Sequence, residues 1–429
     1  MVSNIFIVLV ILLIISTPVA ITLMMVASFP GLIDPSFAAN AHFVLRQVLG
    51  GMESTPLLAI PLFILSGIIM ARGGVSKKLF DVFSFFIGKR TGGMPCAVIV
   101  TCLFYGAISG SAPATTAAVG TMTIPILVKM GYDETFCASL VAVAGGLGVI
   151  IPPSIPFIVY GLSSGASVGA LFEAGIIPGI LIGAMLMLYA WYYCKTKGED
   201  KEKINAVVNE IHSKGLFALL KDSFWALLSP IIILGGIYSG IVTPTEAAVV
   251  SVVYALIIGL FVYKTLCFND LKMIVEETIR TLAPIMFILG TAGAFGKVLA
   301  LLQAPQTIAT LLGGVANNKI LLLLIINIFL LFDGMIVDTS PSILILTPIL
   351  LPLVAPLGVD VVHFGIIMVV NLAIGFVTPP VGVNLYVAST LTNISPLKIA
   401  RHAIPFLIMF GIALILITYI PQISLWLIR

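Results

Sequence analysis

Apolar residues fall into long runs along the whole chain, separated by short polar or Gly/Pro-rich breaks. The runs lie near residues 4–27, 54–70, 94–108, 117–130, 135–151, 154–167 and 174–194, and then near 223–241, 245–263, 282–302, 320–333, 342–357, 361–378, 381–392 and 403–428. A helix that crosses a membrane needs about 20 mostly apolar residues. Strand-like alternation is absent, and backbone within lipid must satisfy its own hydrogen bonds. The pattern therefore predicts an all-α integral membrane protein.

Several of these runs are too short to cross a membrane, and they come in pairs on either side of a Gly, Pro or Ser break. Such pairs predict re-entrant helical hairpins and broken helices, because irregular backbone at membrane depth is tolerated only where it is buried or lines a cavity. The first run, 4–27, is interpreted as a retained span, since no Lys or Arg precedes Arg46 and a secretory signal usually begins with positive charge.

Polar residues are concentrated in one long stretch and two mixed segments. The stretch from Lys195 to Asp222 predicts a division into a first membrane repeat (1–194), a polar linker (195–222) and a second membrane repeat (223–429). Segments 72–90 and 264–281 mix Lys or Arg with large apolar residues, which is typical of amphipathic helices at the membrane interface. Because positive residues gather in these parts, we expect them to face the cytoplasm.

The composition excludes several classes of function. Hydrophobic residues make up 60% of the 429 residues and charged residues only 9%, with a mean hydropathy of +1.20. The net charge is +3 without a basic block, so no nucleic-acid partner is expected. The five cysteines form no CxxC pair, so they are interpreted as buried hydrophobic residues. No GxxxxGK[ST] loop is present, so an ATP-driven mechanism is not indicated.

The two halves of the chain share an internal repeat. Gly106, Ile108, Ser111 and Pro113 recur as Gly334, Ile336, Thr339 and Pro341 at an offset of 228, and Gly148, Pro152 and Pro153 recur as Gly375, Pro379 and Pro380 at 227. Interrupted segments at matching places in two repeats mark the substrate and ion site of many transporters. If each repeat crosses the membrane an odd number of times, the repeats are inverted and their breaks face one cavity. The alternative is a duplicated scaffold without an ion site.

The breaks are candidate sodium sites, because freed carbonyls and hydroxyls supply the oxygen ligands that hard cations prefer. Tandem prolines remove two donors and disfavour helix just before them, which leaves carbonyls free. The predicted sodium-binding residues are Ser109, Gly110, Ser111, Gly145, Gly146, Gly148 and Pro152 in the first half, and Gly334, Asp338, Thr339, Ser340, Gly375, Thr378 and Pro379 in the second. Close packing of small residues between helices is the competing interpretation.

Asp338 stands out because a carboxylate at this depth is costly and is usually functional. It could lie beside a sodium ion, carry a proton, or cap the helix that follows. With Asp333 it could also form the aspartyl pair of an intramembrane enzyme, but a five-residue separation places the two on different helix faces. A passive channel is a further alternative, although it would not need duplicated ion sites.

An anionic substrate would need a cation or polar groups. Among the Lys and Arg residues of the second half, only Lys297 lies well inside an apolar run of the sequence. It is therefore a candidate substrate residue, together with Thr116 and Asn384. Snorkelling of Lys297 to the membrane surface is the alternative. No catalytic residues and no cofactor are expected beyond Na⁺ as the coupling ion.

At these motifs the chain resembles the large membrane subunit of TRAP (tripartite ATP-independent periplasmic) transporters. The resemblance covers nearly the whole chain and rests on the run from Gly106 through Pro153 to Gly179 and on segments 51–67, 243–248 and 377–382. It implies two inverted repeats, each with a re-entrant hairpin and a broken helix, in an elevator-type transporter of the bacterial inner membrane rather than an enzyme.

The resemblance also implies partners and a reaction. A small four-helix membrane subunit, expected here as a separate chain, and a periplasmic substrate-binding protein would assist Na⁺-driven import of an organic acid. C4-dicarboxylates, sialic acid and other sugar acids are the substrates that it implies. A proton-coupled symporter that uses Asp338 is the alternative.

Overall fold

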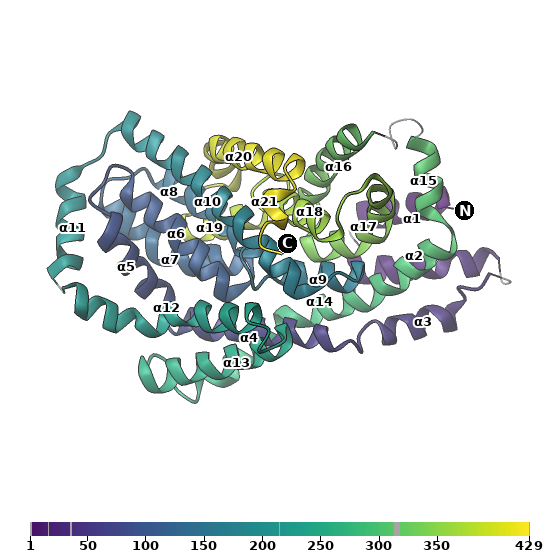
Figure 1. The fold of residues 1–429 in the computed structure, drawn as a ribbon, viewed down its shortest axis with the longest axis horizontal. Coiled ribbons are helices and arrows are strands. Elements are labelled where there is room, and N and C mark those ends of the chain that lie inside the picture. Colours follow the sequence, from purple (N-terminus) through teal and green to yellow (C-terminus); the bar gives the residue numbers. More distant parts are fainter. Residues whose placement is uncertain (1, 16, 35–36, 214, 313–317, 429) are drawn as a thin grey trace.

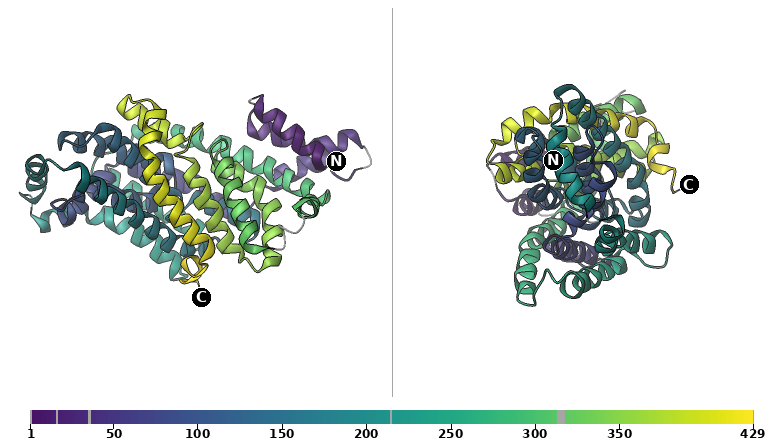
Figure 2. Two further views of the ribbon diagram at one scale, coloured as in Figure 1. Left: turned by 90° about the horizontal axis from the view of Figure 1, so that it is seen from above. Right: turned by 90° about the vertical axis from the view of Figure 1, so that its left-hand side faces the viewer.

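The computed structural model describes residues 2–15, 17–34, 37–213, 215–312 and 318–428, and over these ranges it contains helices and no strand. The molecule is elongated, with α11 at one end and α1, α2 and α15 at the other (Figures 1 and 2). The elements in chain order are α1 (Val2–Ile14), α2 (Val19–Ile33), α3 (Ala41–Gly50), η1 (Thr55–Leu58), α4 (Ala59–Arg72), α5 (Val75–Ile87), α6 (Gly93–Ser109), α7 (Ala112–Lys129), α8 (Glu134–Gly145), η2 (Gly146–Val149), α9 (Ile155–Ser164), α10 (Val168–Lys197), α11 (Lys201–Ser213), α12 (Leu216–Tyr238), α13 (Pro244–Ile257), η3 (Ile258–Val262), α14 (Asp270–Leu301), α15 (Ala304–Leu312), α16 (Lys319–Gly334), α17 (Thr339–Val354), η5 (Ala355–Leu357), α18 (Val361–Gly375), α19 (Val383–Thr392), α20 (Pro396–Tyr419) and α21 (Gln422–Leu425).

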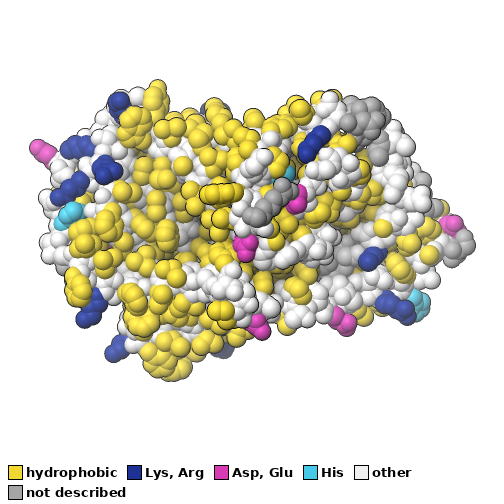
Figure 3. Space-filling view, in the orientation of Figure 1, with side chains coloured by type: hydrophobic (Ala, Val, Ile, Leu, Met, Phe, Trp, Pro, Cys, Tyr) yellow, Lys and Arg dark blue, Asp and Glu magenta, His cyan; other side chains and the backbone are white. Residues whose placement is uncertain are grey.

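Helices long and apolar enough to cross a membrane confirm the predicted class. Within the described ranges there are seven: Thr55–Arg72, Val168–Lys197, Leu216–Tyr238, Pro244–Val262, Asp270–Leu301, Thr339–Leu357 and Pro396–Tyr419. Hydrophobic side chains cover most of the face in Figure 3, and Lys and Arg gather toward the end where α5 and α11 lie. The protein is therefore an all-helical, multi-pass membrane protein.

The structure corrects two boundaries that the hydrophobic pattern predicts, and it shows a helix within the polar stretch. Residues 4–27 are not one span, because α1 ends at Ile14 and Pro18 precedes the first residue of α2. Segments 264–281 and 282–302 are not separate elements, because α14 runs unbroken from Asp270 to Leu301. The polar stretch 195–222 contains the amphipathic helix α11, which buries Ile204, Val208 and Ile211. Charged residues distinguish the segments 264–281 and 195–222 in the sequence, but they do not prevent helix formation there.

The helix boundaries repeat along the chain as the sequence motifs do. Helices α7, α8, α9 and α10 begin at Ala112, Glu134, Ile155 and Val168, and α17, α18, α19 and α20 begin 227 or 228 residues later, at Thr339, Val361, Val383 and Pro396. The same residue types cap matching helices: Asp133 caps α8 and Asp360 caps α18, and Ser167 and Ser395 cap α10 and α20. The sequence repeat is thus a structural repeat.

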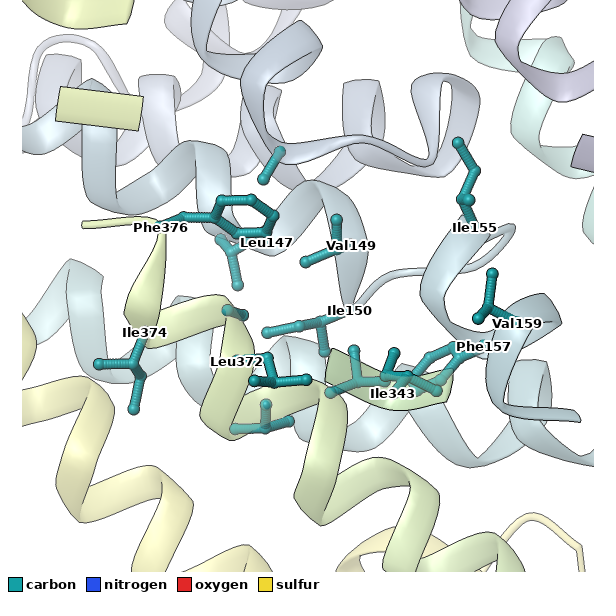
Figure 4. Close-up of a cluster of buried hydrophobic side chains, with 14 of the residues drawn as sticks. Leu147, Val149, Ile150, Ile155, Phe157, Val159, Ile343, Leu372, Ile374 and Phe376 are labelled. Atoms are coloured by element: carbon teal, nitrogen blue, oxygen red, sulfur yellow. The ribbon is translucent and has the colours of Figure 1, made fainter. Parts of the chain in front are cut away.

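An apolar cluster joins the central parts of the two repeats (Figure 4). Leu147 and Val149 come from the break between α8 and α9, Ile374 comes from the end of α18 and Phe376 follows that helix directly; all four side chains are buried. Phe157 of α9 and Ile343 of α17 extend the same cluster. Within a membrane, such contacts are stabilised mainly by van der Waals packing. The cluster therefore holds the two broken regions at fixed places beside one another.

Candidate functional site

A cavity of about 910 Å³ lies where the breaks of both repeats meet. We call residues 109–111, between α6 and α7, the first tip, and residues 335–340, between α16 and the start of α17, the second tip. Ser109, Gly110 and Ser111 line the cavity from the first tip. Asp338, Thr339 and Ser340 line it from the second tip. The structure thus brings together residues that are more than 220 positions apart in the sequence, as the repeat predicted.

The break between α8 and α9 (residues 146–154), the first crossover, packs against the first tip. A Cβ on Gly148 would lie 2.7 Å from the Ser111 carbonyl oxygen, and the Ile155 amide donates to the Gly110 carbonyl at 3.4 Å. Only glycine at position 148 allows this approach. The backbone of the first tip is therefore held against the backbone of the first crossover.

Hydroxyl groups surround the first tip. Ser109 Oγ and Thr115 Oγ1 lie 2.8 Å apart, and Thr115 Oγ1 donates to the Ser111 carbonyl at 2.8 Å. Thr115 was not among the predicted sodium residues. Its signal in the sequence is a hydroxyl placed one helical turn after Ser111, where the side chain reaches back to the tip. The first half-site thus contains three side-chain oxygens beside the backbone carbonyls.

The second crossover, residues 376–382 between α18 and α19, packs on the second tip in the same way. A Cβ on Gly375 would lie 2.7 Å from the Gly334 Cα, and the Val381 amide donates to the Met335 carbonyl at 3.1 Å. Thr378 Oγ1 donates to the Ile374 carbonyl at 2.8 Å. Both repeats therefore build a contact between a hairpin tip and a proline-rich crossover.

Eight predicted sodium residues do not line the cavity: Gly148, Gly334, Gly375 and Thr378, described above, and Gly145, Gly146, Pro152 and Pro379. Gly145 is buried against Thr116, and Gly146 faces the Ala373 carbonyl oxygen. Pro152 is buried, Pro379 is partly buried, and the bonds Pro152–Pro153 and Pro379–Pro380 are cis. These last four residues shape the backbone of the crossovers, and their side chains contribute no ligand atoms.

Asp338 has one role that the structure displays. Its Oδ1 accepts a hydrogen bond from the Thr339 amide at 2.8 Å, so it caps the N-terminus of α17. The residue is exposed and lines the cavity, which also leaves the carboxylate accessible to a cation or a proton. Asp333 does not line the cavity, so the pair of acids considered from the sequence is not assembled there.

The three predicted substrate residues lie away from this cavity. Thr116 donates to the Ala112 carbonyl at 3.0 Å, and Asn384 Nδ2 donates to the Ala142 carbonyl at 2.9 Å; both side chains are buried. Lys297 is exposed on α14 and does not line the cavity. A role of these three residues in substrate binding stays a prediction, and their positions outside the cavity lining do not support it.

Positive charge at the cavity comes from two other residues. Arg72, at the end of α4, and Lys77, in α5, both line it. Arg72 Nη2 forms an ion pair with Glu277 Oε2 at 2.7 Å, which joins α4 to α14. Sequence analysis placed both cations in an interfacial helix. The available signal was that Arg72 directly follows an apolar run, which would set it at the end of a span.

Four helices begin at the cavity. Ser76 of α5, Pro113 of α7, Pro156 of α9 and Ser340 of α17 all line it, each at the second position of its helix. The N-terminus of a helix carries partial positive charge and free amide groups, which favour anions. In the part of the chain that the structure describes, no three His, Cys, Asp or Glu side chains gather as a metal site would need. The cavity therefore combines oxygen-rich tips with helix N-termini that favour an anion, and its lining includes the carboxylates of Glu277 and Asp338 beside Arg72 and Lys77.

Repeated hairpins and broken helices around one cavity define the class of multi-pass membrane transporters. Residues 6–423 match the family described as the tripartite ATP-independent periplasmic transporter, DctM component. The chain belongs to this family. It is a multi-pass inner-membrane protein, and its relatives are named as transporter permeases rather than enzymes.

Relatives with different named substrates support the assignment. The chain is 45% identical over 384 residues to the isethionate TRAP transporter permease protein DctMQ of Oleidesulfovibrio alaskensis, which covers 90% of this chain and 60% of that relative. It is 42% identical to the C4-dicarboxylate large permease DctM of Pseudomonas aeruginosa, over 87% of this chain and 86% of the relative. The sialic acid large permease SiaM of Vibrio cholerae is 36% identical, over 90% of each chain.

A solved structure has the same fold. The YdaH transporter of Alcanivorax borkumensis matches with a TM-score of 0.63 over 94% of this chain and 96% of that chain. The sequence identity is 14%, so the similarity concerns the fold alone.

Proposed function

We propose that this chain is the membrane-embedded subunit of a Na⁺-coupled symporter that imports an organic acid. The observation that carries the proposal is the meeting of the two tips, one from each repeat, at a single cavity that the first turns of four helices also line. Carbonyl and hydroxyl oxygens suit Na⁺, and helix N-termini suit a carboxylate or sulfonate. A coupling ion and an anion can then occupy adjacent positions and stabilise one another.

Two sodium sites follow from the repeat. The first consists of the tip at Ser109, Gly110 and Ser111 with the first crossover, and Thr115 adds a hydroxyl. The second consists of Asp338, Thr339 and Ser340 with the second crossover, including Thr378. Each pairs a tip with the crossover of its own repeat.

The anion would enter past Arg72 and Lys77. The relatives are named for isethionate, C4-dicarboxylates and sialic acid, which are all organic anions. The chemistry that they share is an acidic group of one or two negative charges, and the cationic rim and helix N-termini suit it. We extend the partners implied by the family to this chain: a small membrane subunit and a periplasmic binding protein that delivers the acid.

Sodium coupling provides enough free energy to accumulate an organic acid inside the cell. Entry of two Na⁺ with a monoanion moves one net charge, which contributes about 2.3 kcal/mol at 100 mV. A tenfold Na⁺ gradient adds about 1.4 kcal/mol for each ion. The sum of about 5 kcal/mol supports accumulation of roughly several thousandfold. We further propose that one part of the molecule carries the occupied cavity across the membrane in an elevator movement.

Proton coupling through Asp338 is the second candidate, because this carboxylate is accessible in the cavity. To separate the two, the chain would be reconstituted in liposomes with its small membrane partner, and a binding protein loaded with radiolabelled isethionate, a C4-dicarboxylate or sialic acid would be added. Uptake that requires an inward Na⁺ gradient supports the proposal. Uptake driven by an inward proton gradient without Na⁺ would overturn it in favour of the second candidate.

A further inference from the structure

A buried polar network ties three helices of the second repeat together. Asn371 Nδ2 of α18 donates to Asn327 Oδ1 of α16 at 2.7 Å, and Asn327 Nδ2 donates to Thr418 Oγ1 of α20 at 3.1 Å. His363 Nε2 lies 3.3 Å from the Thr418 carbonyl oxygen. None of the four residues is more than 5% exposed. Such groups are costly to bury unless they are paired, so these bonds strongly specify how the helices pack.

The network lies just before the breaks of the second half-site. Asn327 is seven residues before Gly334, and Asn371 is four residues before Gly375, so each asparagine lies one or two turns before the glycine that ends its helix. A hydrogen bond between the asparagines therefore sets the position of α16 along α18. That position determines where Gly334 meets Gly375, and with it the distance between the second tip and the second crossover.

The first repeat has no such network. With the offsets of 228 for α16 and α20 and 227 for α18, the positions that match Asn327, Asn371, Thr418 and His363 are Ile99, Ala144, Ala190 and Phe136. All four are buried and none carries a polar side-chain atom. Apolar packing is less directional than hydrogen bonding. The two half-sites are thus alike at their tips and differ in what supports them.

We propose that Asn327, Asn371 and Thr418 are positioning residues that preorganise the second sodium site, whereas the helices behind the first site meet through apolar side chains at the matching positions. The inference rests on the proposed sodium coupling. It assigns the network a role in ion affinity that goes beyond holding the fold together. Asn371 Oδ1 and His363 Nδ1 have no hydrogen-bond partner in the described part of the chain, so the network is not a fully satisfied structural unit.

Thr418→Val tests the proposal with the smallest change, since it removes the hydroxyl that accepts from Asn327 and keeps the volume. Asn371→Leu removes the bond between α16 and α18 at similar volume. We expect each variant to raise the Na⁺ concentration for half-maximal uptake by about three- to tenfold, as loss of one buried hydrogen bond implies. Maximal uptake at saturating Na⁺ should be close to that of the wild type. Thr418→Ser, which keeps the hydroxyl, should restore the wild-type Na⁺ dependence.

Thr347→Val is the matched control. Thr347 is also fully buried, but its hydroxyl contacts only the sulfur of Met368, at 3.5 Å. This variant should leave half-saturation by Na⁺ within about twofold of the wild type, because contacts to sulfur are weak. If Asn371→Leu does not fold, the comparison of Thr418→Val with Thr418→Ser decides the question.

Two outcomes have distinct meanings. In the first, wild-type uptake depends on Na⁺, but Thr418→Val does not change the Na⁺ concentration for half-maximal uptake, or Thr347→Val raises it equally. This outcome overturns the positioning role and leaves sodium coupling intact. Wild-type uptake that is indifferent to Na⁺ overturns the sodium proposal and this inference together. Na⁺-dependent thermal stabilisation of the purified chain provides a second readout that needs neither partner protein nor substrate.

Discussion

Gly375 packs on the backbone of Gly334, where a Cβ at position 375 would lie 2.7 Å from the Gly334 Cα. The first repeat has the same relationship, since a Cβ on Gly106 would lie 2.8 Å from the Gly148 Cα. In each repeat, the helix that leads into the tip therefore ends against the helix that leads into the crossover. The duplicated contact explains why glycine stands at all four positions.

Gly375→Ala should weaken the second half-site. Its Cβ would meet backbone atoms of Gly334, which cannot move aside as a flexible side chain can. Overpacking of this kind costs about 1–3 kcal/mol, so we expect Na⁺ to bind about tenfold more weakly or worse. The measurement is the rise in melting temperature of the purified chain on adding Na⁺. Gly411→Ala in α20 is the control, because its Cβ meets nothing within 4 Å and alanine favours helix. A normal Na⁺ response in Gly375→Ala would contradict the prediction.

Two substitutions of Asp338 separate its charge from its role as a helix cap. Asparagine can still accept from the Thr339 amide, whereas alanine cannot and should cost about 1 kcal/mol of stability. We expect Asp338→Asn to melt like the wild type without Na⁺ but to need at least about tenfold more Na⁺ for uptake, since a charged ligand is lost. Wild-type Na⁺ dependence in Asp338→Asn would restrict this residue to capping.

Arg72→Gln tests the cationic rim of the cavity. We expect the substrate concentration for half-maximal uptake to rise about tenfold, because the variant loses a charge-assisted bond to the anion. The Na⁺ dependence should stay unchanged. Stability should change by less than about 1 kcal/mol, because the ion pair with Glu277 is well exposed.

Lys297→Gln is the matched control for Arg72→Gln, because Lys297 is a cation on α14 that does not line the cavity. It should leave half-saturation by substrate near the wild-type value. The opposite ranking of the two variants would restore the substrate role that the sequence predicted for Lys297 and remove it from Arg72.

Glu199 connects the turn before α11 to the membrane part. Burial opposes its ionisation, but hydrogen bonds from Lys201 Nζ at 2.7 Å, the Tyr132 hydroxyl at 2.5 Å and the Gly92 amide at 3.0 Å outweigh it and lower the pKa below 4.5. The charged carboxylate therefore stabilises the fold above about pH 4.5, and this contribution is lost as the pH falls through the lowered pKa.

Glu199→Gln should accordingly melt at a lower temperature than the wild type at pH 7, by a difference equivalent to about 1 kcal/mol. The difference should shrink as the pH falls through the lowered pKa of Glu199. Glu202→Gln, at an exposed position two residues into α11, should differ little from the wild type at either pH. A Glu199→Gln deficit that is independent of pH would contradict the assigned role of the charge.

Features set by a few neighbouring residues were predictable. The two tips, the proline-rich crossovers and their pairing by repeat could be read from Gly, Ser and Pro positions, because these residues act on the backbone locally. The continuity of α14 was not predictable from the sequence. The charged residues near Glu277 favour water, which suggested a separate element, but they are also good helix formers. The membrane environment and the fold class thus followed from the pattern, whereas the break between α1 and α2 and the continuity of α14 did not.

By itself, the sequence determined that this protein lies in a membrane, that it is helical, and that two related sets of broken helices form its centre. Hydrophobic runs and backbone-breaking residues carry that information because their effects are local. Only the tertiary structure decided that Arg72 and Lys77, rather than Lys297, line the cavity, and that Asn327 bonds to Asn371. Which face of a helix meets which neighbour depends on packing between segments far apart in the chain, and no local pattern specifies it.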